Sequence, residues 1–81
     1  MKKIINFENL EITKERKRQI CLICKNLRLE KGISTRELSR IFNLEESAIS
    51  EIERGKRNLT INMLIKYCSY FHVTANYILG F

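Results

Sequence analysis

The sequence of 81 residues contains no proline, only three glycines and one histidine, and it has no long apolar run. No stretch approaches the roughly 18 apolar residues of a transmembrane helix, and none is rich enough in Pro, Gly or Ser to link two domains. We therefore expect one domain with no membrane partner. Residues 1–5 briefly resemble a signal peptide, but Asn6, Glu8 and Glu11 interrupt the apolar stretch, which favours a cytoplasmic protein.

The scarcity of histidine and glycine argues against catalysis. The chain has no Gly-rich phosphate loop, and its carboxylates fall at helix positions expected to face solvent. We expect no enzymatic activity, no cofactor and no small-molecule ligand. Cys21 and Cys24, with Cys68 and His72, have the spacings of two zinc-ligand pairs. Because Cys24 and Cys68 lie on predicted apolar faces, we favour packing in the core over a metal site or thiol switch.

Positive charge exceeds negative charge but is unevenly placed. Fifteen Lys and Arg against nine Asp and Glu give a net charge of +6, which makes a nucleic acid the first partner to consider. Residues 44–53 nevertheless carry four Glu and no base. The first third of the chain holds most of the excess, including the run Lys14, Arg16, Lys17 and Arg18. A run of charge is usually a solvated face, and that interpretation stays open for this run.

Apolar periodicity and capping residues predict an all-α domain of five helices. Residues 1–12 are expected to form an N-terminal extension or arm, and residues 13–81 the folded domain. Hydroxyl residues stand where N-caps are needed: Thr13, Ser34, Thr60 and Thr74. The predicted fourth helix is expected to turn five residues inward: Ile61, Leu64, Ile65, Cys68 and Phe71.

The most informative segment runs from Thr35 to Glu53 and predicts two short helices joined by a three-residue turn. The second helix is expected to begin at Glu45 and Glu46, because acids suit the positive end of the helix dipole. Close packing at the crossing needs a small residue, which Ser39 provides. The turn needs a positive φ, which Asn43 can adopt. A helix held in this way projects into solvent as a probe.

Given these features, residues 20–81 resemble the Cro/repressor-type helix-turn-helix family, also called Xre-like or lambda-repressor-like. The resemblance rests on residues 27–34, 37–39 and 72–80, and above all on Ile49-Ser50-Glu51-Ile52-Glu53-Arg54-Gly55-Lys56-Arg57. Residues 57–61 bear a weaker resemblance to the controller proteins of restriction-modification systems. The family implies a five-helix lambda-repressor-like fold with the third helix in the DNA major groove. It also implies homodimers that bind palindromic operators.

The resemblance assigns individual residues to DNA by position. The base-facing residues would be Glu46, Ser47, Ser50 and Glu51. The phosphate-facing residues would be Thr35, Arg36, Arg54, Lys56, Arg57 and Asn58. Arg28 and Glu53 match a buried structural ion pair of the family, and charged residues within apolar faces are expected to pair.

The acids of the predicted reading helix depart from the family, which often has neutral or basic residues there. A carboxylate is repelled by phosphates, although Glu can accept a hydrogen bond from cytosine N4. Glu46 and Glu51 therefore either read a C-containing site, weaken binding as negative selection, or indicate that the groove-facing role is lost. Two functions follow: a sequence-specific transcriptional regulator of repressor or controller type, or a protein-interaction module of the same fold. The second would be antitoxin-like or a regulatory partner, with weak or no DNA binding.

The last part of the chain is unusually apolar. Residues 58–81 hold five of the seven aromatic residues and one charged side chain, Lys66. Exposed apolar patches on small domains mark association, and a chain of this length has a modest core that dimerisation would help. We therefore predict a two-fold interface. It would include Thr74, Ile78, Leu79 and Phe81.

Overall fold

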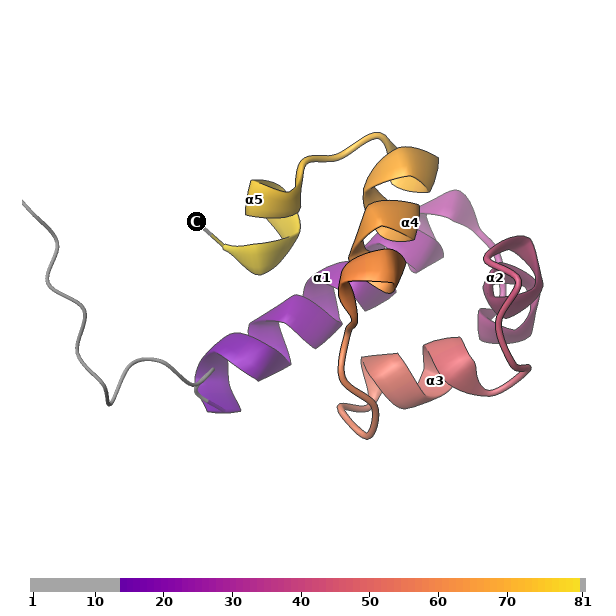
Figure 1. Cartoon of the computed structure of the whole chain (residues 1–81), viewed down its shortest axis with the longest axis horizontal. Helices are drawn as coiled ribbons and strands as arrows, with labels where there is room; N and C mark the ends of the chain where they lie inside the picture. The colour runs from indigo at the N-terminus through magenta and orange to yellow at the C-terminus, as the bar shows by residue number, and fades with distance from the viewer. Residues whose placement is uncertain (1–13, 81) are drawn as a thin grey trace, which may run out of the picture.

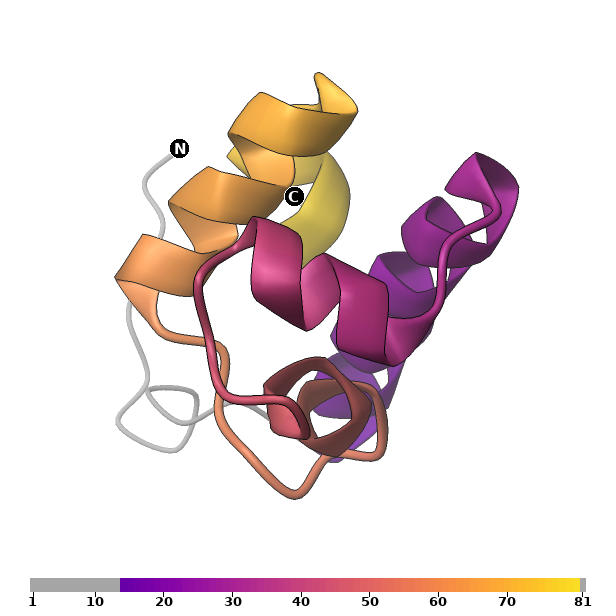
Figure 2. The same ribbon diagram turned by 90° about the vertical axis from the view of Figure 1, so that its right-hand side faces the viewer.

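The computed structural model describes residues 14–80, and this part of the chain is helical, with no strand. The helices are α1 (Lys14–Lys31), α2 (Thr35–Ile41), α3 (Ala48–Glu53), α4 (Ile61–Phe71) and α5 (Ala75–Leu79). In Figure 1, α3 lies below α1, whereas α4 and α5 lie above it. Figure 2 shows α3 almost end-on beneath α2. The predicted all-α, five-helix fold is confirmed; the predicted arm, Thr13 and Phe81 lie outside the described residues.

Three helices begin at a hydroxyl residue that caps the first turn. In each case the side-chain oxygen accepts a hydrogen bond from the amide three residues later, at 3.0, 3.2 and 3.1 Å for Ser34, Thr60 and Thr74. Each bond satisfies one of the amides that a helix start leaves without a partner. These three predicted caps are confirmed. None of the helices described is long and apolar enough to cross a bilayer.

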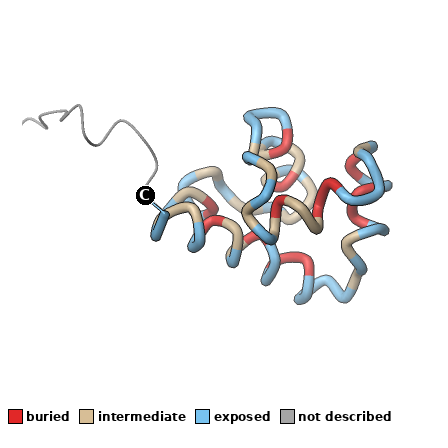
Figure 3. Tube along the Cα trace, turned by 90° about the horizontal axis from the view of Figure 1, so that it is seen from below, coloured by how far each residue is buried: buried red, intermediate tan, exposed pale blue. Residues whose placement is uncertain are grey.

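The core lies between α1 and the helices around it, and buried positions follow the inner face of each helix (Figure 3). Its largest fully buried side chain is Tyr67 of α4. Phe42, just after α2, packs edge-on against Tyr67 with ring centroids 5.1 Å apart. Such aromatic pairs contribute roughly 0.5–1.5 kcal/mol beyond the area they bury. The Phe42–Tyr67 contact therefore fastens the end of α2 to α4.

Cys24 belongs to this core, as predicted. The residue is 0% exposed, and burial raises the pKa of its thiol to about 12. A thiol that stays protonated at neutral pH is neither a nucleophile nor a ready metal ligand. Cys21 and Cys68 are half-buried, and all three thiols are free. Between residues 14 and 80, no group of three or more His, Cys, Asp or Glu is placed to hold a metal ion.

The inner face of α4 differs from the prediction. Ile61 and Ile65 are 74% and 56% exposed, so the expectation that they point inward is wrong. The helix presents Met63 and Tyr67 to the core. Leu64, Cys68 and Phe71 pack against that core, so the prediction is confirmed for these three.

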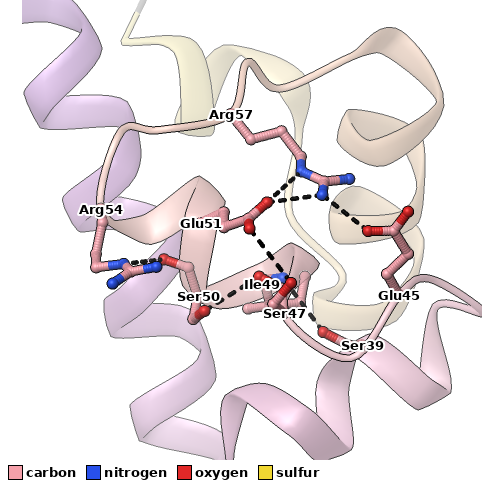
Figure 4. A network of polar contacts seen from close by, with 8 residues as sticks. All are labelled: Ser39, Glu45, Ser47, Ile49, Ser50, Glu51, Arg54 and Arg57. Atoms are coloured by element: carbon pink, nitrogen blue, oxygen red, sulfur yellow. Dashed lines mark hydrogen bonds and ion pairs between the residues drawn. The ribbon is translucent and has the colours of Figure 1, made fainter.

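The start of α3 also differs from the prediction. The helix begins at Ala48 rather than at Glu45 and Glu46, because the Ala48 amide donates to the Glu45 carbonyl in a preceding turn, at 3.0 Å. Ser47 occupies the N-cap position but makes no side-chain cap. Buried Ser39 of α2 acts in its place: its hydroxyl accepts from the Ile49 amide at 3.2 Å (Figure 4). Ser39 is therefore more than the small residue that the crossing requires.

An ion pair ties α1 to α3. Arg28 donates to both carboxylate oxygens of Glu53, from Nε at 2.7 Å and from Nη2 at 3.0 Å. Its Nη1 donates to the Ile33 carbonyl at 2.8 Å. The two side chains are only 10% and 6% exposed. The buried pair that the family resemblance implies is therefore present, and it joins three separate segments of the chain.

Glu53→Gln is expected to lower the free energy of unfolding in urea by about 3 kcal/mol, because removing one partner leaves the other charge buried alone. The double substitution Arg28→Met/Glu53→Leu is the matched control and should recover most of that loss, since it leaves no unpaired charge. A Glu53→Gln protein as stable as the parent would contradict the structural role of the pair.

Ser39→Ala is expected to lower the unfolding free energy by about 1 kcal/mol, because the buried Ile49 amide would lose its acceptor. Thermal melting followed by circular dichroism measures the change. Ser69→Ala, an exposed serine substitution on α4, serves as the control and should leave the midpoint unchanged. Equal midpoints for the two variants would show that Ser39 is no more than a small residue at the crossing.

Candidate nucleic-acid interface

α3 is anchored by one face and leaves the other free. Its anchoring residues are almost fully buried, with 0–1% exposure: Ala48, Ile49 and Ile52. The turn that leads to it depends on Asn43, whose φ of 58° confirms the predicted left-handed conformation. The resemblance assigned four residues to bases, and Glu46 lies in the turn just before α3. The other three lie on the outward side of the helix (Figure 4): Ser47, Ser50 and Glu51.

Arg57 folds back from the α3–α4 loop onto the acids of the reading helix. Its Nε and Nη2 donate to Glu51 Oε1 at 2.9 and 2.7 Å. Nη2 also donates to Glu45 Oε1 at 3.1 Å, and Ser47 Oγ donates to Glu51 Oε2 at 3.3 Å. Figure 4 shows the guanidinium lying between the two carboxylates. Predicted base-facing and phosphate-facing residues thus form one connected group.

The Arg57 contact changes the electrostatics of Glu51. The hydrogen bond from Arg57 holds the pKa of Glu51 below its usual value, and the hydrogen bond to Glu51 raises the pKa of Arg57. Both groups therefore stay charged over the neutral range. Because the two charges lie side by side, Glu51 presents much less net negative charge to an approaching phosphate than an isolated carboxylate would.

Glu46 is paired in a similar way. Arg36 Nε lies 2.6 Å from Glu46 Oε2, and the side chains are 62% and 66% exposed. Exposed pairs of this kind contribute little to stability and exchange readily with other partners. Arg36 is therefore held near the reading helix while remaining accessible to another anion.

The remaining phosphate-facing candidates lie around the ends of α3. Arg54 is exposed and its Nε donates to the Ser50 carbonyl at 3.3 Å. Lys56 and Asn58 are exposed in the α3–α4 loop, and Thr35 is half-buried at the start of α2. Within the described chain, these residues do not join the Arg57 group through side-chain hydrogen bonds.

Two residues at this surface were missed by the sequence. Glu45, assigned only to a helix start, is the second carboxylate on Arg57. Lys17 of α1 donates to Asn58 Oδ1 at 3.3 Å, so α1 reaches the loop that carries the phosphate-facing candidates. In the sequence, the only indications of these two residues were the adjacent acids Glu45 and Glu46 and the basic run that includes Lys17. The folding of the α3–α4 loop is what brings Glu45 and Lys17 to this surface.

The predicted dimer residues do not form one exposed patch. Ile78 is 0% exposed and packs inside its own chain, so its prediction as an interface residue is corrected. Thr74 is exposed and caps α5, while Leu79 is half-buried and its carbonyl accepts from Arg16 Nη1 at 3.1 Å. Tyr77, which was not assigned to the interface, is 57% exposed beside them on α5.

Comparison with known proteins gives a family but no individual relative. A search of the curated proteins found no match to this chain. The sequence model of the family described as Helix-turn-helix (HTH_3) matches residues 25–78, which include the whole of α2, α3 and α4. The match spans more than half of the chain and contains every residue that we assigned to DNA. The protein therefore belongs to the Helix-turn-helix family HTH_3, a family of DNA-binding regulators that is typically non-enzymatic.

Proposed function

We propose that this protein is a sequence-specific transcriptional regulator, of repressor or controller type, that binds a palindromic DNA operator as a homodimer. α3 would enter the major groove, while residues of the α3–α4 loop and the start of α2 contact the phosphates on either side. The observation that carries the proposal is the Glu51–Arg57 pair. It places a group that can read a base next to a group that binds phosphate.

Arg57 is able to serve Glu51 and a phosphate together. A guanidinium has five N–H donors, and those on Nε and Nη2 are engaged by Glu51 and Glu45. The two donors on Nη1 take no part in these bonds. A phosphate oxygen that approaches Nη1 would therefore meet an arginine already oriented by two carboxylates.

Glu51 gains a matching advantage from Arg57. A carboxylate in the major groove can accept a hydrogen bond from cytosine N4, which distinguishes C·G from other pairs. The nearby guanidinium offsets the repulsion between this carboxylate and the DNA backbone. Of the three roles that the sequence left open for Glu51, the pairing therefore supports the reading of a C-containing site.

Substitution at the two partners separates positioning from reading. Arg57→Ala is expected to weaken binding to all sequences and to lower the salt slope of log K by about 0.9, the value for one phosphate contact. Glu51→Ala is expected to change mainly the preference at one C·G pair, by roughly 5- to 150-fold, equivalent to about 1–3 kcal/mol. Mobility-shift titrations over a range of salt concentrations around about 150 mM, with DNA from upstream of the protein's own gene, measure both effects.

Two outcomes would contradict this assignment. If Glu51→Ala raised affinity equally for every sequence, Glu51 would be a repulsive group and not a base reader. If the parent protein shifted no DNA under these conditions, the exposed acids Glu45 and Glu46 would favour the protein-interaction module, with α3 as a protein-facing surface.

The proposed homodimer would use the surface around α5, with Thr74, Tyr77 and Leu79, together with the predicted interface residue Phe81. Tyr77→Glu is expected to convert a dimer to a monomer in sedimentation at high micromolar concentration, because a charge would be buried at the interface. Leu29→Glu is the control, since Leu29 is 53% exposed on α1, and it should leave the dimer intact. A parent protein that sediments as a monomer would count against the dimer itself.

A further inference from the structure

The structure contains a basic groove between α1 and the end of α3 that the interface described above does not include. It has a volume of about 440 Å³, and Cys21 and Leu22 of α1 are among the residues that line it. One wall is α1 and the other is the corner at Arg54 and Gly55, where α3 turns into the α3–α4 loop. The basic side chains that line it are Lys14, Lys17, Arg18, Lys25 and Arg54.

The groove carries a large excess of positive charge. Glu53 is the one carboxylate among the described residues that line it, and Arg28 already neutralises that group. The cations of α1 therefore face the groove without a compensating acid in its walls. Lys14, Arg18 and Lys25 are all exposed, so an anion can reach them.

The basic run of α1 is divided between two tasks. Arg16 donates from Nη1 to the carbonyls of Leu79 and Gly80, at 3.1 and 2.8 Å, and so fastens α1 to the end of α5. A Cβ on Gly80 would lie 2.5 Å from Arg16 Nη1, which shows how closely this contact is built. Lys14, Lys17 and Arg18 lie at the groove instead. If the run were only a solvated face, its basic side chains would have no reason to divide between α5 and the groove.

The groove is continuous with the proposed DNA surface at two points. Arg54 lines the groove and is also a phosphate-facing candidate. Lys17, on the opposite wall, donates to Asn58, the last of those candidates in the loop. Figure 4 shows Arg54 on the side of α3 that lies next to α1. A duplex seated on α3 would therefore extend past Arg54 toward α1.

We propose that this groove binds the DNA sugar-phosphate backbone beyond the segment read by α3, through Lys14, Arg18 and Lys25. The family match begins at residue 25, so the groove-lining part of α1 is almost wholly an addition to the matched domain. The inference rests on the proposed function, because it adds phosphate contacts to the same DNA complex.

The spacing of the cations suits a nucleic-acid strand. Eleven residues separate Lys14 from Lys25 in α1, which is about 16 Å of helix at 1.5 Å per residue. Phosphates of one DNA strand rise by about 3.4 Å each along the duplex axis. The row of cations is therefore several phosphates long, which suits a nucleic-acid strand rather than a single small anion.

The test compares two double variants that remove the same charge. Lys14→Gln/Arg18→Gln changes the groove, whereas Lys31→Gln/Arg40→Gln changes exposed bases at the end of α1 and on α2. Binding to a random-sequence duplex of about 40 bp is followed by fluorescence anisotropy against salt concentration. The groove variant is expected to lower the salt slope of log K by about 1.8, or about 0.9 for each of two phosphates. The control variant should keep the parent slope. Circular dichroism melting should show that both variants fold like the parent.

A footprint gives an independent readout on the full chain. Acetylation by an N-hydroxysuccinimide ester, followed by mass spectrometry, should show Lys14 and Lys25 protected by the duplex and Lys31 unprotected. Equal slopes for the two double variants, or equal acetylation with and without DNA, would overturn the groove as a phosphate site.

The outcomes distinguish this proposal from the one on which it rests. If Arg57→Ala weakens binding and the groove variant does not, only the groove proposal fails, and the basic face of α1 is a solvated surface. If the parent protein binds neither this duplex nor the DNA from upstream of its own gene, both proposals fail; if it binds only the upstream DNA, the groove proposal alone fails.

Discussion

The arrangement of this protein depends on the buried contact between Arg28 and Glu53. The pair connects the middle of the molecule, through α1, to the last residue of α3, and Arg28 also holds the carbonyl of Ile33 before α2. A buried pair need not add net stability, because desolvation offsets much of the attraction. Separating the partners is nevertheless so costly that other arrangements of α3 on α1 are disfavoured. The recognition surface and the basic groove both begin where this contact places the end of α3.

Charge compensation on the outer surface accompanies the acids of α3 and of the turn before it. Glu51 and Glu46 are each held by an arginine, Arg57 and Arg36 respectively. The Arg36–Glu46 pair is exposed and costs little to rearrange, whereas Arg57 and Glu51 are half-buried, with 30% and 32% of their side chains exposed. The net charge of the chain does not reveal this pairing. If the same acids were unpaired, they would repel the phosphates of DNA.

The local features of the fold were predictable from the sequence. Ser34, Thr60 and Thr74 cap helices because a hydroxyl next to a helix start satisfies a nearby amide whatever the tertiary context. Asn43 adopts a positive φ for a similarly local reason. The pairing of Arg28 with Glu53 was predictable because each stands within an apolar face, where an unpaired charge is too costly. These residues specify the helix-turn-helix and its attachment to α1.

Features that depend on how helices rotate against each other were not predictable. Periodicity placed Ile61 and Ile65 inside, but α4 turns Met63 and Tyr67 toward the core and leaves both isoleucines exposed. The error at Ile78 is the opposite one: we predicted this residue at the dimer surface, and it lies in the core. The start of α3 was misplaced because a turn from Glu45 to Ala48 precedes the helix, and Ser39, on another helix, accepts from the Ile49 amide in its first turn.

The sequence by itself determined the helical class, the family and the candidate residues for a DNA surface, since short-range spacing and residue type are enough for these. Only the tertiary structure decided how the charges are distributed among partners. Arg57 with Glu45, Lys17 with Asn58 and Arg16 with Gly80 are contacts between residues distant in sequence. The sequence does not distinguish one long basic side chain from another. Folding alone determines which of them reaches an acid, which reaches a carbonyl, and which faces an open groove.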